Sequence, residues 1–285
     1  MLSTNRPRQL ILSLWLLGSA LDLPAATFEL APAKDARILG LSGYDTANFA
    51  TDILSVYTVA DNVQRTLLEF DLSQVTFEPG TRVSAATLTL HASLGFGGSN
   101  GKPMFVHAVN RPWSETGLTW RKADNTANWF SAGGDFVGTD GRPSGTPFAV
   151  STTAPGEGGP VTWELRELVD RWIEGVAPNH GLLLSSTEGN GLTLHQRESP
   201  FTTFRPRLQI VTEPGPPRLR ISLESATGNL VLSWRGVGTA VLQERPLAGT
   251  HSDWTDSQLP VTAAADRSTV TVAPTAARIY RLRSN

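Results

Sequence analysis

The sequence contains no cysteine among its 285 residues, and only three of its 24 basic residues are lysine. The missing cysteine excludes disulfides, thiol nucleophiles and cysteine zinc sites, so the folded chain must rely on its hydrophobic core for stability. The net charge of -2 excludes a strong overall field that would recruit nucleic acid. At 40% hydrophobic and 18% charged residues, the composition is that of a globular protein of one or two domains.

No long apolar run is present either; the N-terminal run, LILSLWLLG at residues 10–18, is too short to span a bilayer comfortably. Arg6 and Arg8 precede this run, and small residues follow it. Residues 1–26 therefore predict a cleaved export signal and a secreted or cell-surface protein without a transmembrane segment in the mature chain. A retained N-terminal anchor is the alternative.

Short runs of alternating polarity, separated by turn residues, begin at residue 35 and predict an all-β fold. In ATLTLHA, Leu88 and Leu90 would face the core, whereas Thr87, Thr89 and His91 would face outward. Similar runs occupy residues 35–41, 53–59, 64–72, 103–109, 181–187, 191–197 and 206–212.

One stretch, VTWELRELVDRWIEGVAPNHGLLL at residues 161–184, contains an amphipathic helix pattern. Thr162 could cap this helix and Gly175 could end it. We expect it to cover an open edge or end of the sandwich, with Trp163 and Trp172 in the core. Its apolar face comprises Leu165, Leu168, Val169, Trp172, Ile173 and Val176.

Strands on both sides of a single helix predict a β-sandwich or jelly roll over residues 27–212. Within it, EGNG at 188–191 predicts a hairpin turn. Closely spaced prolines predict a stiff linker at 213–217. Residues 218–285 contain about five further strand patterns, which predict a small C-terminal β-sandwich.

Five segments follow one another along the chain: DNVQRTLLEFDLS (61–73), VSAATLTLH (83–91), WSETGLTW (113–120), VTWELRELVDRWIEGVAPNHGLLLSS (161–186) and RESPFTTFRPRLQIV (197–211). In this order they resemble the DNRLRE-type domain, a family of secreted bacterial and archaeal modules that overlaps a carbohydrate-binding family. The resemblance covers residues 33–212 and implies a β-sandwich that binds polysaccharide. Such domains are often joined to an enzyme or another surface module, whereas this chain has no long catalytic domain beside the module.

A sugar-binding site needs aromatic rings for the apolar face of a pyranose and polar or cationic groups for its hydroxyls and carboxylates. In the irregular segment 110–159 we expect Trp129 and Phe130 to be the exposed pair. Trp113 and Trp120 belong to the family signature and are structural candidates. Alternatively, all these aromatic residues anchor loops onto the sandwich. The candidate binding residues are Trp129, Phe130, Tyr44, Arg111, Arg121 and Lys122.

Catalytic motifs are weak in this sequence. GGSNG at 97–101 matches the pattern of a hydrolase nucleophile, but a second strand pattern follows it where a helix is required. Glu69 and Asp71 could form a carboxylate pair, but surface charge or a turn cap at Asp71 explains them better. We therefore predict a non-catalytic protein that binds polysaccharide, uronic-acid-containing polymers included. The alternatives are a structural or adhesive surface protein with protein partners, and a polysaccharide-degrading enzyme.

No cofactor is predicted, and the identity of any metal ligands remains undefined. A structural calcium ion is an alternative, because loop carboxylates provide the hard oxygen ligands that calcium prefers. Three strand histidines could bind zinc if they shared one face. The residues concerned are Asp35, Asp124, Asp135 and Asp140 for calcium, and His91, His107 and His195 for zinc.

Overall fold

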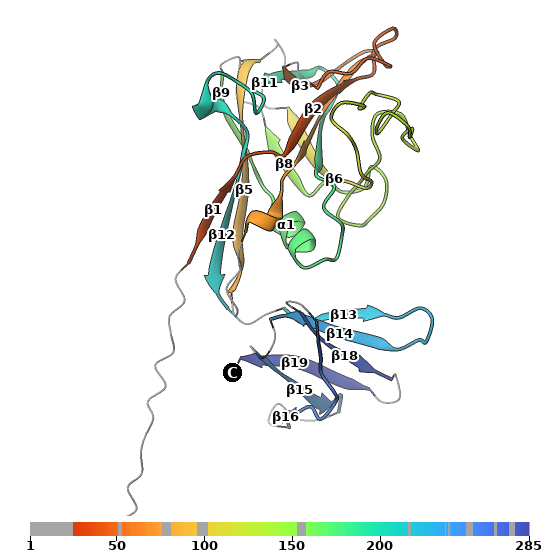
Figure 1. Cartoon of the computed structure of the whole chain (residues 1–285), viewed down its shortest axis with the longest axis vertical. Coiled ribbons are helices and arrows are strands. Elements are labelled where there is room, and N and C mark those ends of the chain that lie inside the picture. Colours follow the sequence, from red (N-terminus) through yellow and green to blue (C-terminus); the bar gives the residue numbers. More distant parts are fainter. Residues whose placement is uncertain are drawn as a thin grey trace, which may run out of the picture.

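A computed structural model describes two β-rich units joined in sequence (Figure 1). Most of the predicted export signal lies outside the described residues. No helix in the described ranges is long and apolar enough to cross a membrane. These ranges are 25–50, 53–75, 81–95, 102–152, 158–215, 218–236, 238, 240–248, 253–264, 267–273 and 277–284.

The first unit is built of antiparallel strands, one α-helix and two short 3-10 helices. Its strands are β1 (Thr27–Leu30), β2 (Lys34–Leu39), β3 (Leu54–Val59), β4 (Asn62–Glu69), β5 (Thr81–Gly95), β6 (Pro103–Val109), β7 (Phe136–Val137), β8 (Ala149–Thr152), β9 (Gly159–Glu164), β10 (Leu182–Ser186), β11 (Asn190–Leu194) and β12 (Arg207–Pro214). Its helices are η1 (Leu72–Gln74), α1 (Arg166–Ile173) and η2 (Thr202–Phe204).

The sheet of this unit curls into a sandwich of the jelly-roll kind, as the alternation predicted. Strand β5 pairs with β12 and β11 and also with β9. Strand β9 lies beside β8, which pairs with β6, and β6 continues through β10 and β4 to β3. Because β3 pairs with β11, the path returns to β5 and encloses the main core.

Strands β4 and β10 are buried on both faces of the sheet. On β4, Leu68 points into the main core, whereas its neighbour Leu67 belongs to a second cluster. This second cluster also contains Leu183 of β10 and, from the irregular segment, Trp113 and Trp129. The irregular segment thus covers the outer face of β4 and β10, and both faces of these strands are apolar.

The helix forms, but it begins later than predicted. Residues 161–164 continue strand β9, so Thr162 cannot cap the helix, and Leu165 takes the cap position without a side-chain hydrogen bond. The predicted helix start was wrong because residues 161–164 have the period of a strand: Val161 and Trp163 are buried, and Thr162 and Glu164 between and after them are exposed. The helix ends at Ile173, and Gly175 follows the cap residue Glu174 with a φ of +67° that suits glycine, as expected of the residue that stops the helix.

The helix covers the main core with the residues expected of it. Leu168, Val169 and Trp172 are buried, and Ile173 packs against them. Val176 is the exception at 50% exposed, because the chain has already left the helix there.

The predicted hairpin at residues 188–191 is wrong. Strand β10 pairs with β4 and β6, whereas β11 pairs with β3 and β5. The turn therefore carries the chain from one layer of the sandwich to the other. A turn motif defines the local reversal of the chain, but it does not decide which strands become neighbours.

The second unit contains two small antiparallel sheets around a core of its own, formed by Leu232, Trp234, Ala240, Leu242 and Val270. Its strands are β13 (Arg220–Leu223), β14 (Leu230–Arg235), β15 (Ala240–Pro246), β16 (Thr255–Asp256), β17 (Thr262–Ala264), β18 (Arg267–Val272) and β19 (Arg278–Ser284).

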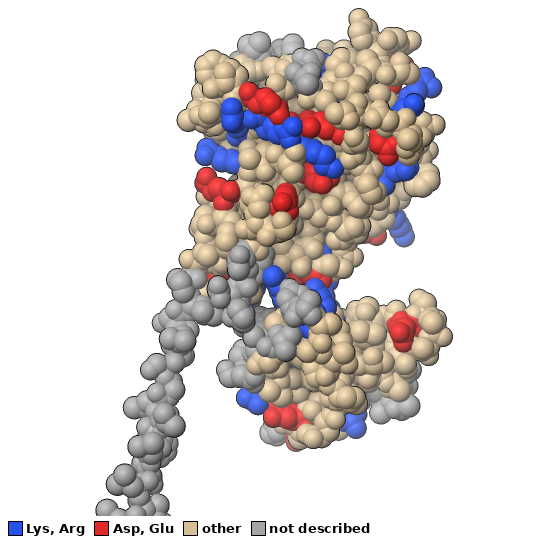
Figure 2. Space-filling view, viewed as in Figure 1, with Lys and Arg blue, Asp and Glu red and all other residues tan. Residues whose placement is uncertain are grey.

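The two units meet through ion pairs at the end of helix α1. Arg218 pairs with Asp170 at 2.8 Å, and Arg220 pairs with Glu174 at 3.3 Å. Arg267 also donates to the backbone carbonyl of Glu174 at 2.6 Å. Basic side chains lie at this junction in Figure 2. These cations stand at the negative end of the helix dipole, which adds to the attraction.

Truncation tests whether each unit folds independently. Strand β12 pairs with β5 as far as Pro214, so a chain ending at Gly215 keeps the whole first sheet. Because the two units have separate cores, we expect this fragment to be soluble and to melt cooperatively. Thermal unfolding followed by circular dichroism measures this, with the full chain as control. An aggregating fragment beside a stable full chain would contradict the proposed boundary.

Candidate functional site

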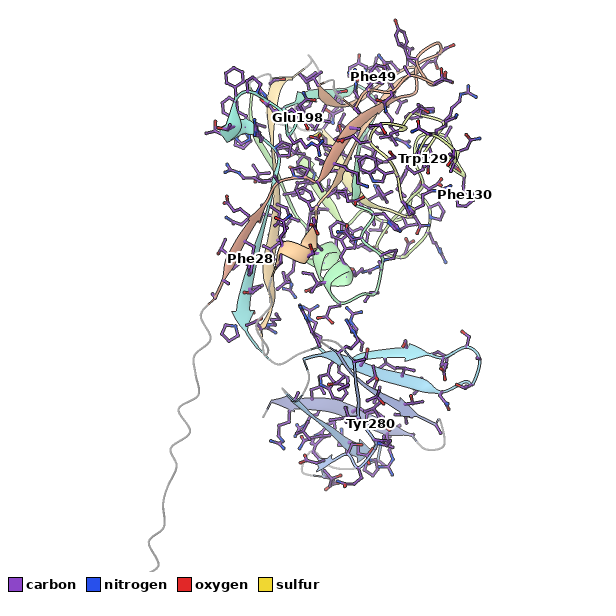
Figure 3. The ribbon with its side chains drawn as sticks, in the orientation of Figure 1. Phe28, Phe49, Trp129, Phe130, Glu198 and Tyr280 are labelled. Atoms are coloured by element: carbon purple, nitrogen blue, oxygen red, sulfur yellow. The ribbon has the colours of Figure 1, made fainter. Side chains whose placement is uncertain are left out.

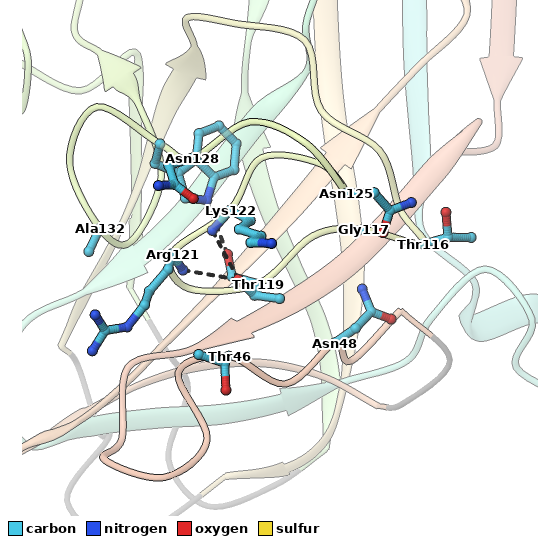
Figure 4. A pocket seen from close by; sticks show the side chains of 11 residues that line it. Thr46, Asn48, Thr116, Gly117, Thr119, Arg121, Lys122, Asn125, Asn128 and Ala132 are labelled. Carbon is cyan, nitrogen blue, oxygen red and sulfur yellow. Dashed lines mark hydrogen bonds between the residues drawn. The ribbon is translucent and has the colours of Figure 1, made fainter.

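A hollow of about 590 Å³ opens between the turn after β2 and the irregular segment after β6 (Figure 4). Its walls combine polar groups, namely amides, hydroxyls and two cations, with apolar surface in similar measure. The lining residues are Thr46, Asn48, Thr116, Gly117, Thr119, Arg121, Lys122, Asn125, Asn128, Trp129 and Ala132.

Tryptophans fasten the irregular segment to the sandwich. Trp113 is buried, and its indole N–H donates to the carbonyl of His180 at 2.9 Å. Trp120 stacks with the guanidinium of Arg65 at 5.0 Å and packs against Gly133. A Cβ atom at position 133 would lie 2.8 Å from the Trp120 ring. The backbone φ of Gly133, +96°, also favours glycine. The signature tryptophans are therefore structural.

Thr119 and Asn48 shape the hollow. The hydroxyl of Thr119 accepts the backbone N–H groups of Arg121 and Lys122 at 3.1 and 2.9 Å, which turns the chain and presents both cations (Figure 4). Across the hollow, the amide of Asn48 donates to the carbonyls of Glu115 and Leu118. The two walls, 70 residues apart in sequence, are thereby held together.

The two cations differ in how they are engaged. Arg121 pairs with Asp45, its Nε donating at 2.6 Å, although the Arg121 side chain remains 63% exposed. Lys122 is exposed, and its ammonium group has no ion-pair partner in the described parts of the chain. Lys122 can therefore offer its full charge to an anionic ligand.

Phe130 stands beside the hollow and is 89% exposed, so the prediction of exposure is confirmed for this ring. The guanidinium of Arg111 lies 4.9 Å from the ring centre and also donates to the carbonyl of Asn128. Phe130 and Asp135 line a smaller neighbouring hollow of about 240 Å³. Arg111 thus supports the phenyl ring from the protein side.

Trp129 does not form an exposed pair with Phe130, which corrects the expectation. Only 5% of Trp129 is exposed, and its indole N–H donates to the carbonyl of Thr119 at 3.1 Å. Figure 3 places Trp129 within the loops, whereas Phe130 lies at the margin. The physical reason is that Trp129 fills the second core layer above β4 and β10.

Tyr44 is 52% exposed on the turn that follows β2. It does not line either of the two hollows. The structure thus brings Arg121, Lys122 and Trp129 to one hollow, Phe130 to its neighbour, and Arg111 beneath Phe130.

The carboxylates considered for catalysis have structural partners. Glu69 pairs with Lys34 at 2.7 Å. Asp71 caps η1, as predicted, by accepting the N–H of Ser73 at 2.9 Å. Hydrogen bonds from the side chain and the backbone of Ser73 lower the pKa of Asp71. The GGSNG motif lies outside the described residues.

The candidate metal ligands do not assemble. Asp124, Asp135 and Asp140 each accept backbone N–H groups of their own turns. His107 contacts Phe136, whereas His91 and His195 both contact Phe204. In the described ranges no three histidines or carboxylates are grouped so that they could hold a metal ion.

Asp35 belongs instead to a buried ionic network. The N–H of Arg197 donates to its carboxylate at 2.7 Å, and the N–H of Asp35 donates to Glu115 at 2.9 Å. The guanidinium of Arg197 pairs with Glu115 at 2.9 Å and also with Glu198. Burial raises the pKa of Asp35 to about 6, although the hydrogen bond from the N–H of Arg197 acts to lower it. Two signature segments, WSE and RES, therefore meet at the start of β2.

The sequence reasoning missed the amides and hydroxyls of the hollow. Asn125 and Asn128 lie in ADNTANW, a polar stretch beside a tryptophan, which was the available signal. Thr46 and Asn48 gave no such signal, because they belong to a distant turn. Only the hydrogen bonds of Asn48 place that turn against the irregular segment.

Comparison with protein families supports a carbohydrate-binding module in the first part of the chain. Residues 26–132 match the model of Carbohydrate-binding module family 96. The match includes three of the five segments that resemble the DNRLRE-type domain, whose name stays a prediction for this chain. No curated protein matches the sequence. Every residue that lines the 590 Å³ hollow lies inside the matched segment.

Proposed function

We propose that the chain is an exported, non-catalytic protein that binds polysaccharide in the 590 Å³ hollow. The observation that carries this proposal is the coincidence of the hollow with the segment that matches a carbohydrate-binding family. Its volume lies in the range of ligand sites, about 300–1,000 Å³. Its amides and hydroxyls can exchange hydrogen bonds with sugar hydroxyls.

The two cations favour an acidic sugar. Arg121 can present a planar fork to a carboxylate, and Lys122 adds an exposed point charge. Uronic-acid-containing polymers are therefore the ligands we expect to bind best. Because Trp129 is buried, recognition in the hollow depends on polar contacts more than on stacking.

Binding without hydrolysis is favoured by the lining itself. Glycosidases generally use two carboxyl groups about 5–10 Å apart. Among the described residues, no aspartate or glutamate lines the hollow, and the nearby Asp45 is paired with Arg121. Release of reducing or unsaturated sugar from alginate, pectin, cellulose or chitin would contradict this part of the proposal.

Affinity electrophoresis in gels that contain these polymers tests the proposal. We expect retardation of the parent protein by a uronate polymer and a loss of affinity of about 10- to 100-fold in Arg121→Ala/Lys122→Ala, as charged hydrogen bonds are removed. Added salt should weaken retention, because the charges are exposed.

The matched control is Arg82→Ala/Lys102→Ala, which makes the same change in net charge outside the hollow. Equal loss in both variants would indicate unspecific charge attraction. Absence of retardation by every polymer would favour the alternative of an adhesive protein with protein partners.

A further inference from the structure

Four aromatic rings gather on the outer face of the sandwich, away from the hollow. Phe201 precedes η2 as its cap residue, Phe204 is the last residue of η2, and the two are 59% and 40% exposed. Phe204 lies 5.2 Å from His91 of β5 and 5.1 Å from His195, which follows β11. The two phenylalanine rings are 5.9 Å apart. We call this group the ring cluster.

Hydrogen bonds hold the ring cluster in place. The hydroxyl of Ser199 lies 3.0 Å from Nδ1 of His195 and accepts the N–H of Phe201 at 3.3 Å. Arg205 donates to the carbonyl of Ser199 at 2.9 Å. Ser199 itself is only 4% exposed. The exposed rings are therefore carried by a buried anchor, which reduces the ordering cost of binding.

Polar atoms stand beside the rings. Nδ1 of His195 is engaged by Ser199, and among the described residues no hydrogen bond reaches its Nε2. A neutral imidazole nitrogen can donate or accept according to its tautomer, and a sugar hydroxyl can do the same. Burial lowers the pKa of His91, and the positive charge of the exposed Arg207 lowers it further.

The size and chemistry of the ring cluster fit a single sugar ring better than a protein partner. Single exposed apolar residues are ordinary, but two phenylalanines with two histidines on a fixed frame indicate an interaction site. A stable protein interface needs roughly 20–30 residues on each side. Four rings match one pyranose instead, which has an apolar face for stacking and hydroxyls at its edge.

We infer that the ring cluster is a second sugar-binding surface, which stacks one pyranose ring of a polysaccharide on Phe201 and Phe204. The inference rests on the proposed function for its ligand class. It assigns binding to residues that, His91 apart, lie beyond the segment matched by the family. A chain with two sites could hold a polymer at both, which raises the overall affinity.

Nuclear magnetic resonance of the full-length protein tests this inference. The probes are hexasaccharides of glucose, xylose, N-acetylglucosamine, mannuronate and galacturonate. We expect one of them to shift the imidazole resonances of His91 and His195, and to do so equally in Arg121→Ala/Lys122→Ala. Phe201→Leu/Phe204→Leu keeps the apolar character but removes both rings, and its affinity should fall about tenfold, by analogy with stacking on bases.

The outcomes separate the two sites. Imidazole shifts that persist in the hollow variant and weaken in the leucine variant support the ring cluster, whatever happens at the hollow. Binding that disappears in the hollow variant and is unchanged in a folded leucine variant overturns the inference and leaves the proposed function intact. Absence of binding by all probes overturns both. A melting curve equal to that of the parent verifies the fold of each variant.

Discussion

Trp172→Ala should lower the free energy of unfolding by about 3–5 kcal/mol, the usual cost of replacing a buried large side chain by alanine. Trp172 is 6% exposed and packs into the main core from helix α1. A domain of ordinary stability, about 5–15 kcal/mol, would be seriously weakened. Urea unfolding of the parent and the variant measures the difference.

Two further variants sharpen this test. Val176→Ala changes a residue just beyond the same helix that is 50% exposed, so it should have little effect. Trp172→Phe should lower the free energy of unfolding less than Trp172→Ala does, because a phenyl ring still fills much of the site. The indole N–H that it removes has no hydrogen-bond partner in the described structure. If Trp172→Ala left stability unchanged but abolished retention by a polysaccharide, Trp172 would be a binding platform.

Asp35 should make the parent less stable as the pH rises from about 4 to above 6. Its pKa in the folded protein is about 6, above the ordinary 3.8, because the carboxyl group is buried. Folding therefore favours the protonated form. Its stabilising contribution is complete below about pH 4 and is lost as the pH rises through 6. A shift of this size corresponds to about 3 kcal/mol.

Asp35→Asn removes this titration, so the difference in stability between parent and variant should change by about 3 kcal/mol across that pH window. The asparagine carbonyl can still accept the N–H of Arg197. Asp61→Asn, at an exposed position, is the control with the same change in charge. Parallel stability curves for the parent and Asp35→Asn, measured by urea unfolding from pH 4 to 8, would show that Asp35 does not titrate in this window.

The ionic network around Asp35 gives a structural role to two of the segments that resemble the DNRLRE-type domain. Glu115 comes from WSETGLTW and Arg197 from RESPFTTF, and both reach the start of β2. Three acidic side chains share one arginine there. Glu115 and Arg197 thereby hold segments together that are up to 164 residues apart.

The sequence by itself determined the fold class and the location of the helix. In β5, Thr87 to His91 alternate as predicted, and Leu88 and Leu90 are fully buried. Alternation suffices for this because a strand presents successive side chains to opposite faces. The helical spacing of Leu168, Val169 and Trp172 carries similar information at a different period.

Only the tertiary structure decided which strands pair and which aromatic residues are exposed. Strands β10 and β11 diverge into different layers, although the turn between them resembles a hairpin. Trp129 is buried and Phe130 exposed, although they are neighbours, because the irregular segment folds back over a sheet face that was already apolar. The hollow forms where Asn48 meets residues 115–118. An irregular loop has no periodicity that reports its contacts, so such long-range placement cannot be derived from local pattern.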